Sequence, residues 1–244
     1  METLNFTLSY SENRKSENAI PVVIVAAGSS TRMKGIAKPF AEIGGIPVIV
    51  RTLLAFERSN RISNIVLVTK KEFIPEMQKF ADAYAISKLT DIVEGGSNRQ
   101  ESVLCGIKTV KNAEKVLIHD GARPLVSLDL IDKICDEIKD KPCVICATKV
   151  KDTIKSVASD GFVRTTHKRD ELYSVQTPQA VDLNDYLKIF ENTNTEIFTD
   201  DASMFESYNY PVKVVEGEYT NLKITTPEDI ALAEFYIEQL GDNL

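Results

Sequence analysis

The sequence has no block of basic residues and no long apolar run. Its 36 Asp and Glu residues outnumber its 29 Lys and Arg residues, which gives a formal net charge of −7. This balance argues against a nucleic-acid-binding surface, although it is compatible with a local cationic pocket. No segment has the length of a membrane-spanning helix, and the first 20 residues contain no apolar segment of signal-peptide length. We therefore expect a soluble cytoplasmic protein that binds neither nucleic acid nor a membrane.

Histidine and cysteine are also scarce, with two His and four Cys residues in the chain. Cys143 and Cys146 form a Cys-x-x-Cys pair, but no second Cys or His pair is present to complete a zinc site. The pair lies in a segment that is typical of a buried strand, where residues three apart point to opposite faces. We interpret these cysteines as small core residues of a reduced cytosolic protein. No His or Cys nucleophile arrangement is evident either.

Strand-like and helix-like segments alternate from Ile20 onward. Apolar strands are expected at residues 20–26, 65–68, 92–93, 116–118 and 143–147, and amphipathic helices at 46–58, 72–83, 99–110 and 128–139. This alternation predicts a parallel sheet that is covered by helices on both faces. The length of 244 residues suits one large α/β domain.

The alternation stops near residue 150. Residues 150–180 hold short β-prone pieces, many charges and few core residues, so we expect an arm that leaves the domain. Beyond it we expect helices near 182–192 and 200–207, strands at 212–215 and 222–224, and a last helix that Pro227 opens after Thr225 or Thr226. The polar residues 1–19 predict a flexible leader, which leaves 20–244 as a single domain that includes the arm.

The loop after the first strand, residues 26–38, has the small residues of a phosphate-binding loop. In an open parallel sheet, ligands bind at the carboxyl ends of the strands. The loop does not match a Walker loop, because Gly28 is not followed by the Walker pattern. It does not match a dinucleotide fingerprint either, because that motif requires three glycines and only Gly28 is present at those positions. Arg32 and Lys38 instead suit a triphosphate. The alternative is a solvated turn with exposed cations.

Two more loops have functional character. Residues 95–102 follow the third strand and enter a helix, where glycine, serine and arginine can hold a base or a phosphate at the helix N-terminus. Residues 119–124 follow the fourth strand, and Asp120 is placed there as a Mg²⁺ ligand. A turn or helix cap is the alternative role for Asp120. We expect His119 to serve the strand end and not catalysis.

Four stretches together have a recognisable order and spacing. They are A-A-G-S-S-T-R-M (26–33), G-G-S-N-R-Q-E-S-V (95–103), H-D-G-A-R-P (119–124) and N-L-K-I-T-T-P-E-D-I (221–230). Three shorter stretches agree with them: K-D-T-I-K (151–155), V-Q-T-P-Q-A (175–180) and T-D-D-A-S (199–203). In this combination the chain resembles the 2-C-methyl-D-erythritol 4-phosphate cytidylyltransferases of the non-mevalonate isoprenoid pathway, over about residues 20–240.

The resemblance implies an α/β, Rossmann-like nucleotidyltransferase fold, with a mostly parallel sheet flanked by helices and an extended β-arm that forms a homodimer. It implies CTP as a substrate and Mg²⁺ as a cofactor, with Asp120 as the metal ligand. The residues implied to bind the nucleotide are Ala26, Ala27, Gly28, Gly96, Ser97, Ser102 and Gly121. The residues implied to act in catalysis are Arg32, Lys38, Arg169 and Lys223. The residues implied to bind the methylerythritol phosphate are Asp120, Arg123, Thr177 and Lys223, with Thr153 and Arg169 from the arm of the second subunit.

The implied reaction needs no general base, because the attacking phosphate oxygen is already anionic. Positioning and charge neutralisation would then provide most of the catalysis. Two other functions are open at this point. One is a cytidylyltransferase for ribitol 5-phosphate, a similar short polyol phosphate. The other is a non-catalytic nucleotide-binding module, against which the joint presence of Arg32, Lys38, Asp120 and Lys223 argues.

Overall fold

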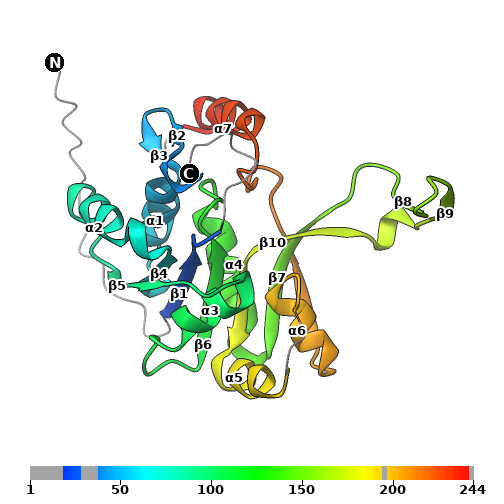
Figure 1. Cartoon of the computed structure of the whole chain (residues 1–244), viewed down its shortest axis with the longest axis horizontal. Coiled ribbons are helices and arrows are strands. Elements are labelled where there is room, and N and C mark those ends of the chain that lie inside the picture. Colours follow the sequence, from blue (N-terminus) through cyan, green and yellow to red (C-terminus); the bar gives the residue numbers. More distant parts are fainter. Residues whose placement is uncertain (1–18, 29–37, 194–196, 242–244) are drawn as a thin grey trace.

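A sheet of seven strands forms the centre of the computed structural model, which describes residues 19–28, 38–193 and 197–241. Its strand order is β11-β7-β10-β6-β1-β4-β5 (Figure 1). The strands are β1 (Ile20–Val25), β4 (Ile62–Thr69), β5 (Leu89–Glu94), β6 (Lys115–Asp120), β7 (Cys143–Lys149), β10 (Tyr173–Asp182) and β11 (Val212–Glu216). All neighbouring pairs are parallel except those of β10, which runs antiparallel to both β6 and β7. The prediction of a mostly parallel sheet is confirmed.

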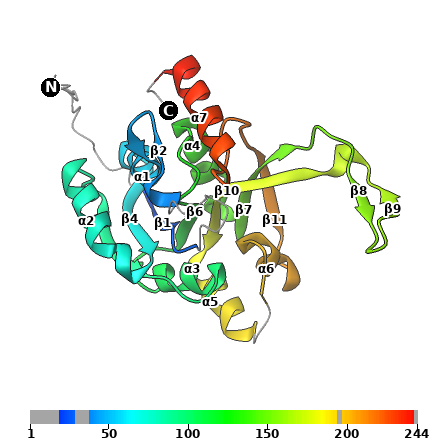
Figure 2. The same ribbon diagram turned by 45° about the horizontal axis from the view of Figure 1, so that its top comes forward.

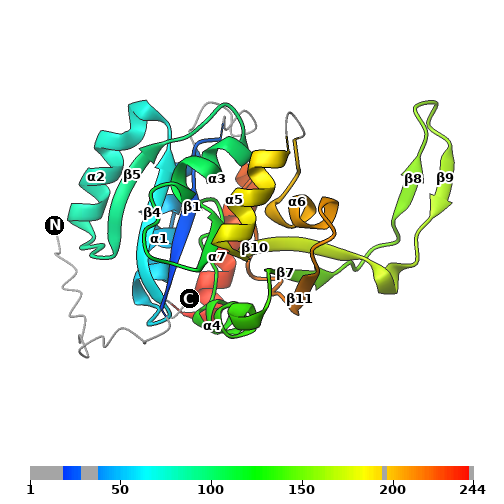
Figure 3. The same cartoon turned by 90° about the horizontal axis from the view of Figure 1, so that it is seen from below.

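Helices cover both faces of this sheet (Figure 3). One face packs against α1 (Val48–Arg58), α2 (Ile74–Ala83) and α4 (Leu128–Glu137). The other face packs against α3 (Arg99–Ile107), α5 (Leu183–Asn192) and α6 (Asp201–Ser207). Successive residues of β1 alternate between the two layers, so Val22 lies in the first core and Val23 in the second. This two-sided burial explains why the parallel strands are continuously apolar.

A third, smaller core lies beside the sheet. Here α7 (Pro227–Leu240) packs on the hairpin of β2 (Glu42–Ile43) and β3 (Ile46–Pro47). Helix α7 begins at Pro227 after the N-cap residue Thr226, as predicted. The carboxylate of Asp229 accepts hydrogen bonds from the backbone N–H groups of Thr225 and Thr226. Short 3-10 helices complete the fold at η1 (Lys38–Phe40), η2 (Lys71–Phe73), η3 (Ile138–Asp140) and η4 (Arg169–Glu171).

The arm is a two-stranded antiparallel hairpin of β8 (Lys155–Val157) and β9 (Val163–Thr166). It projects away from the sheet and its helices in all three views (Figures 1 and 2). Large apolar side chains are exposed on it, including Phe162 at 76%. Among the residues that the structure describes, the arm therefore has no core that buries them.

The arm is shorter than the predicted range of 150–180, because Tyr173–Asp182 forms the central strand β10. Its buried residues include Gln176, Thr177 and Gln179, whose polar side chains concealed a core strand in the sequence. Pro178 also argues against a core strand in the sequence, because proline is rare in the middle of a sheet. It lies where the β10–β7 register shifts between Val175 and Gln179.

Two further predictions concern single segments. Residues 222–224 were expected to form a strand but are an extended loop, because Ile224 N–H bonds to the Ala122 carbonyl outside any strand pair. Cys143 and Cys146 are free and buried in opposite cores, as expected for residues three apart on a strand. No helix in the described ranges is both long and apolar enough to cross a membrane.

Candidate functional site

The loops after β1 and β6 meet at the carboxyl edge of the sheet. Val25 and Asp120 are paired at the ends of the two strands, and Gly121 N–H donates to the Val25 carbonyl at 2.9 Å. A Cβ on Gly121 would lie 3.0 Å from the Ala26 Cβ and 3.2 Å from the Val25 oxygen. A larger residue here would push against both groups, so glycine favours the close approach that brings the two predicted ligand loops together.

The loop at residues 95–98 closes the other side of this edge. A Cβ on Gly95 would lie 2.5 Å from that of Ala27, so this loop packs directly on the first one. Gly96 N–H donates to Ser102 Oγ at 3.1 Å, and Ser97 donates to Glu101 Oε2 from both N and Oγ at 2.8 Å. The predicted nucleotide-binding residues Gly96, Ser97 and Ser102 thus lie together, and their own hydrogen bonds shape the loop.

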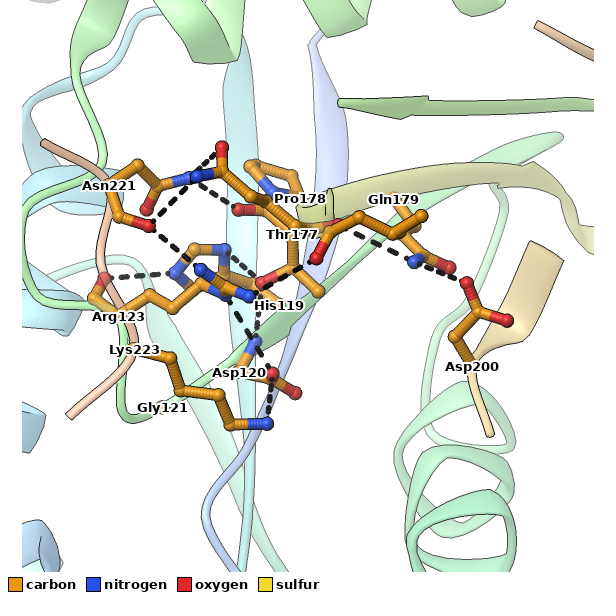
Figure 4. Close-up of polar contacts among 12 residues, drawn as sticks. His119, Asp120, Gly121, Arg123, Thr177, Pro178, Gln179, Asp200, Asn221 and Lys223 are labelled. Atoms are coloured by element: carbon orange, nitrogen blue, oxygen red, sulfur yellow. Dashed lines mark hydrogen bonds and ion pairs between the residues drawn. The ribbon is translucent and has the colours of Figure 1, made fainter. Parts of the chain in front are cut away.

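Asp120 lies among three cations at the end of β6, and Figure 4 shows two of them, Arg123 and Lys223. Its Oδ2 is 2.7 Å from Lys223 Nζ and 3.9 Å from Arg123 Nε, and its Oδ1 is 3.4 Å from Arg99 Nε. Burial by itself would raise the pKa of Asp120, but the charges of Arg99 and Lys223 lower this pKa well below its usual range. The carboxylate is therefore ionised at neutral pH.

Arg99 joins Asp120 to a second acid that was not predicted as a site residue. Its Nη2 lies 2.8 Å from Oδ2 of Asp201, whose side chain is only 2% exposed. That oxygen has no aligned hydrogen bond, so the contact is ionic. Burial raises the pKa of Asp201, and the charge of Arg99 opposes the rise. Both residues lie in the quoted motifs, but nothing in the motifs shows that they meet.

Arg123 is buried, and its donors face the protein. Nη1 donates to the Asn221 carbonyl at 2.8 Å, which ties the guanidinium to the loop that carries Lys223 (Figure 4). Burial lowers the pKa of Arg123. Asn221 in turn donates to the Thr177 carbonyl at 2.9 Å. Arg123, Thr177 and Lys223 are thus brought together as predicted, but Arg123 already has a partner within the chain.

His119 and Thr177 bind each other next to Asp120 (Figure 4). The His119 ring is fully buried, with Nδ1 at 3.1 Å from Thr177 Oγ1 and Nε2 at 3.1 Å from the Arg123 carbonyl. Burial lowers the pKa of His119 to about 3. These contacts agree with the expected role of His119 at the strand end.

The two arm residues are not brought to this edge. Thr153 and Arg169 are exposed, and Arg169 Nη1 donates to the Lys151 carbonyl at 3.2 Å within the arm. Gly28 is exposed at the end of the first described segment. Arg32 lies outside the described residues, and so does the side chain of Lys38, whose backbone begins η1. Their predicted roles stay predictions.

A divalent ion would find one carboxylate here and not a complete cage. Within the described ranges, no three His, Cys, Asp or Glu side chains are grouped so that they could hold a metal ion. Mg²⁺ commonly takes one or two carboxylates and completes its shell with water and substrate phosphates. The ionised Asp120 therefore fits a Mg²⁺ site that is completed by a substrate.

Known sequences resemble this chain over most of its length. The model of the 2-C-methyl-D-erythritol 4-phosphate cytidylyltransferase family matches residues 20–239. A protein of that name from Clostridium novyi is 45% identical over 224 residues, which cover 89% of this chain and 96% of that protein. Another from Halalkalibacterium halodurans is 44% identical over 216 residues, which cover 87% of this chain and 94% of that protein.

Solved structures show the same fold. The 4-diphosphocytidyl-2C-methyl-D-erythritol synthase of Anaerococcus prevotii superposes with a TM-score of 0.81 at 36% identity, covering 91% of this chain and 96% of that one. The 2-C-methyl-D-erythritol 4-phosphate cytidylyltransferase of Thermus thermophilus superposes with a TM-score of 0.74 at 27% identity, covering 90% and 99%. These matches confirm the predicted fold, and the chain belongs to the 2-C-methyl-D-erythritol 4-phosphate cytidylyltransferase family.

Proposed function

We propose that the chain transfers a cytidylyl group from CTP to 2-C-methyl-D-erythritol 4-phosphate, which gives CDP-methylerythritol and pyrophosphate. Family membership supports this proposal. The observation that carries it within the molecule is the ionised carboxylate of Asp120 among three cations at the sheet edge. Both substrates are polyanions, so a protein of net charge −7 needs such a local concentration of positive charge.

In this reaction a phosphate oxygen of methylerythritol phosphate attacks the α-phosphorus of CTP. The new oxygen–phosphorus bond forms as the bond to the bridging oxygen breaks, and pyrophosphate leaves with that electron pair. The nucleophile is anionic near neutral pH, so no side chain has to remove a proton. The work of the protein is to position two polyanions and to neutralise their charge.

Lys223 is the described cation best placed for this work. Its side chain is 42% exposed, whereas those of Arg99 and Arg123 are 27% and 11% exposed. The ammonium can therefore turn from Asp120 toward a phosphate at little cost in burial. We propose that Arg32 and Lys38 bind the triphosphate, and that Ala26, Ala27, Gly28 and the loop at 95–102 hold the nucleotide.

We propose Mg²⁺ as the cofactor, held by Asp120 and by phosphate oxygens. Support comes from the ionised state of Asp120 and from the preference of Mg²⁺ for one or two carboxylates with substrate phosphates. When bound, the ion supplies positive charge to the reacting phosphates.

We also propose a homodimer in which Thr153 and Arg169 of one arm serve the site of the other subunit. The arm supports this idea, because it projects away from its own site and exposes Phe162 and Val157. A cytoplasmic location is proposed as well, because all four cysteines are free.

A pyrophosphate-release assay tests the proposed function. The enzyme is given CTP and Mg²⁺ with either methylerythritol phosphate or ribitol 5-phosphate, and UTP replaces CTP in a control. We expect turnover with CTP and methylerythritol phosphate at a kcat/KM well above that for ribitol 5-phosphate. A higher kcat/KM for ribitol 5-phosphate would contradict the proposal and identify ribitol 5-phosphate as the substrate. CTP binding without turnover on either polyol phosphate would indicate a non-catalytic binding module.

A further inference from the structure

The hydroxyl of Thr177 has two partners beneath the proposed site, and both are internal. Asp120 N–H donates to Oγ1 at 3.0 Å, and His119 Nδ1 lies 3.1 Å from the same oxygen (Figure 4). Thr177 is 4% exposed and His119 is fully buried, so water does not compete for these contacts. The direction of the His119–Thr177 hydrogen bond therefore decides where the only hydroxyl proton of Thr177 is.

That direction follows from the other side of the ring. His119 Nε2 lies 3.1 Å from the carbonyl oxygen of Arg123, which can only accept, so Nε2 carries a proton. A neutral imidazole then has a bare Nδ1 that can only accept. The ring is fully buried, which disfavours its charged form. The adjacent carboxylate of Asp120 would favour a charged ring, but it already binds Lys223 at 2.7 Å. Thr177 must therefore donate its proton to Nδ1 while it accepts from Asp120 N–H.

We propose that His119 is a positioning residue whose bare Nδ1 binds the Thr177 hydroxyl proton, so that Thr177 fixes the backbone of Asp120 and has no proton to give to a phosphate oxygen of the substrate. The hydroxyl can then only accept, so a substrate group that reaches it must be a hydroxyl of the polyol. The statement about the substrate rests on the proposed function, whereas the hydrogen-bond direction does not.

This arrangement matters for the site because both the backbone N–H and the carboxylate of Asp120 are bound. Its N–H is held by Thr177, and its carboxylate binds Lys223 and Arg99. If the Thr177 hydroxyl turned toward a substrate phosphate, His119 Nδ1 would lose its buried donor. The fixed acceptor on His119 therefore keeps the end of β6 in one position, and misplaced catalytic groups are costly in rate.

The tautomer can be read directly by NMR, because the chain has only two histidines. His167 lies in the exposed arm, so a His167→Gln variant leaves His119 as the single labelled ring when histidine is enriched in ¹⁵N. We expect a protonated Nε2 and a bare, hydrogen-bonded Nδ1, both unchanged when saturating methylerythritol phosphate is added. A protonated Nδ1, or loss of the hydrogen bond to Nδ1 on adding this substrate, would overturn the proposal. This readout does not require turnover, so it is independent of the assay of the proposed function.

A matched pair of variants tests the role in the reaction. In His119→Asn the amide oxygen takes the place of Nδ1 as an acceptor, whereas in His119→Gln the amide lies nearer the place of Nε2. We expect Asn to retain about tenfold more kcat than Gln, with KM for methylerythritol phosphate within about threefold in both. Equal kcat per folded molecule in the two variants would refute the positioning role.

Thr177→Val and Thr177→Ser form a second matched pair, in which the effects on kcat and on KM are compared. We expect Val to lower kcat by about 10–100-fold with little change in KM, and Ser to restore most of the loss, because Ser keeps the hydroxyl. A raised KM for methylerythritol phosphate in Thr177→Val at unchanged kcat would show that Thr177 acts in substrate binding and not by fixing Asp120, which would overturn the proposal.

Discussion

The pair of Arg99 and Asp201 allows a test that separates stability from activity. In Arg99→Met, the Asp201 carboxylate, whose side chain is 2% exposed, loses a cation at 2.8 Å. Removing one partner of a buried ion pair costs about 3–5 kcal/mol. Arg99 is 27% exposed and its contact with Asp201 is not an aligned hydrogen bond, so we expect a smaller loss, of about 2–3 kcal/mol.

The double variant Arg99→Met with Asp201→Asn removes both charges and keeps the volumes. We expect it to recover about half or more of the lost stability, because no uncompensated buried charge is left. Activity should not recover with it, since Asp120 still lacks the cation that lies 3.4 Å from its Oδ1. The loss of stability would then come from the contact of Arg99 with Asp201, and the loss of activity from its contact with Asp120.

Urea unfolding of the four proteins of this cycle, followed by circular dichroism, measures the coupling energy. In thermal unfolding, the single Arg99→Met change should lower Tm by about 4–12 °C for a chain of this size. The reasoning would be refuted if the two single changes added to give the double variant within about 0.5 kcal/mol. It would also be refuted if the double variant regained the original kcat.

Three further predictions concern the same site. Lys223→Ala should lower kcat by about 10²–10³-fold, as for the loss of one transition-state donor, and steady-state kinetics with a check of the folded state would measure it. Mixed dimers of Arg32→Ala and Arg169→Ala chains should regain activity if the arm acts in the other subunit, and proven heterodimers without activity would argue against shared sites. Although burial alone raises the pKa of Asp120, its neighbouring cations lower it overall, so its stabilising effect is present above about pH 4 and is lost as the pH falls. Asp120→Asn should therefore show a smaller acid-induced decrease in the urea midpoint than the unchanged protein.

The parallel strands could be predicted because their buried positions are occupied by apolar residues. Val22, Val23 and Ile24 are each fully buried, and they alternate between two apolar layers. The central strand β10 could not be predicted in this way, because half of its buried stretch is polar. Gln179 donates to Asp200, and Thr177 binds His119 far away in the sequence. A buried polar residue is identified by its partner, and a pattern along one segment does not contain that partner.

Lys223 shows a different limit of the sequence. The alternation of Leu222, Lys223 and Ile224 is typical of a strand, and it led to the prediction of a strand where the structure has a loop. Ile224 is fully buried, which accounts for the apolar pattern, but its N–H bonds to the Ala122 carbonyl in a loop. Period-two alternation reports which side chains are buried, and it does not report which backbone groups pair.

The order of strands and loops was enough to place Asp120 and Arg123 at the ligand-binding edge, because the carboxyl ends of parallel strands share one edge. Lys223 was added only by the family resemblance. What neither could distinguish is which cation is already bound within the protein. Arg123 is 11% exposed and donates to the Asn221 carbonyl, whereas Lys223 is 42% exposed and binds Asp120. An incoming phosphate would have to break buried hydrogen bonds to reach Arg123, but it can exchange with a half-exposed ion pair at Lys223. The geometry therefore favours Lys223 as the cation that moves to the substrate, with Arg123 holding the loop from which it moves.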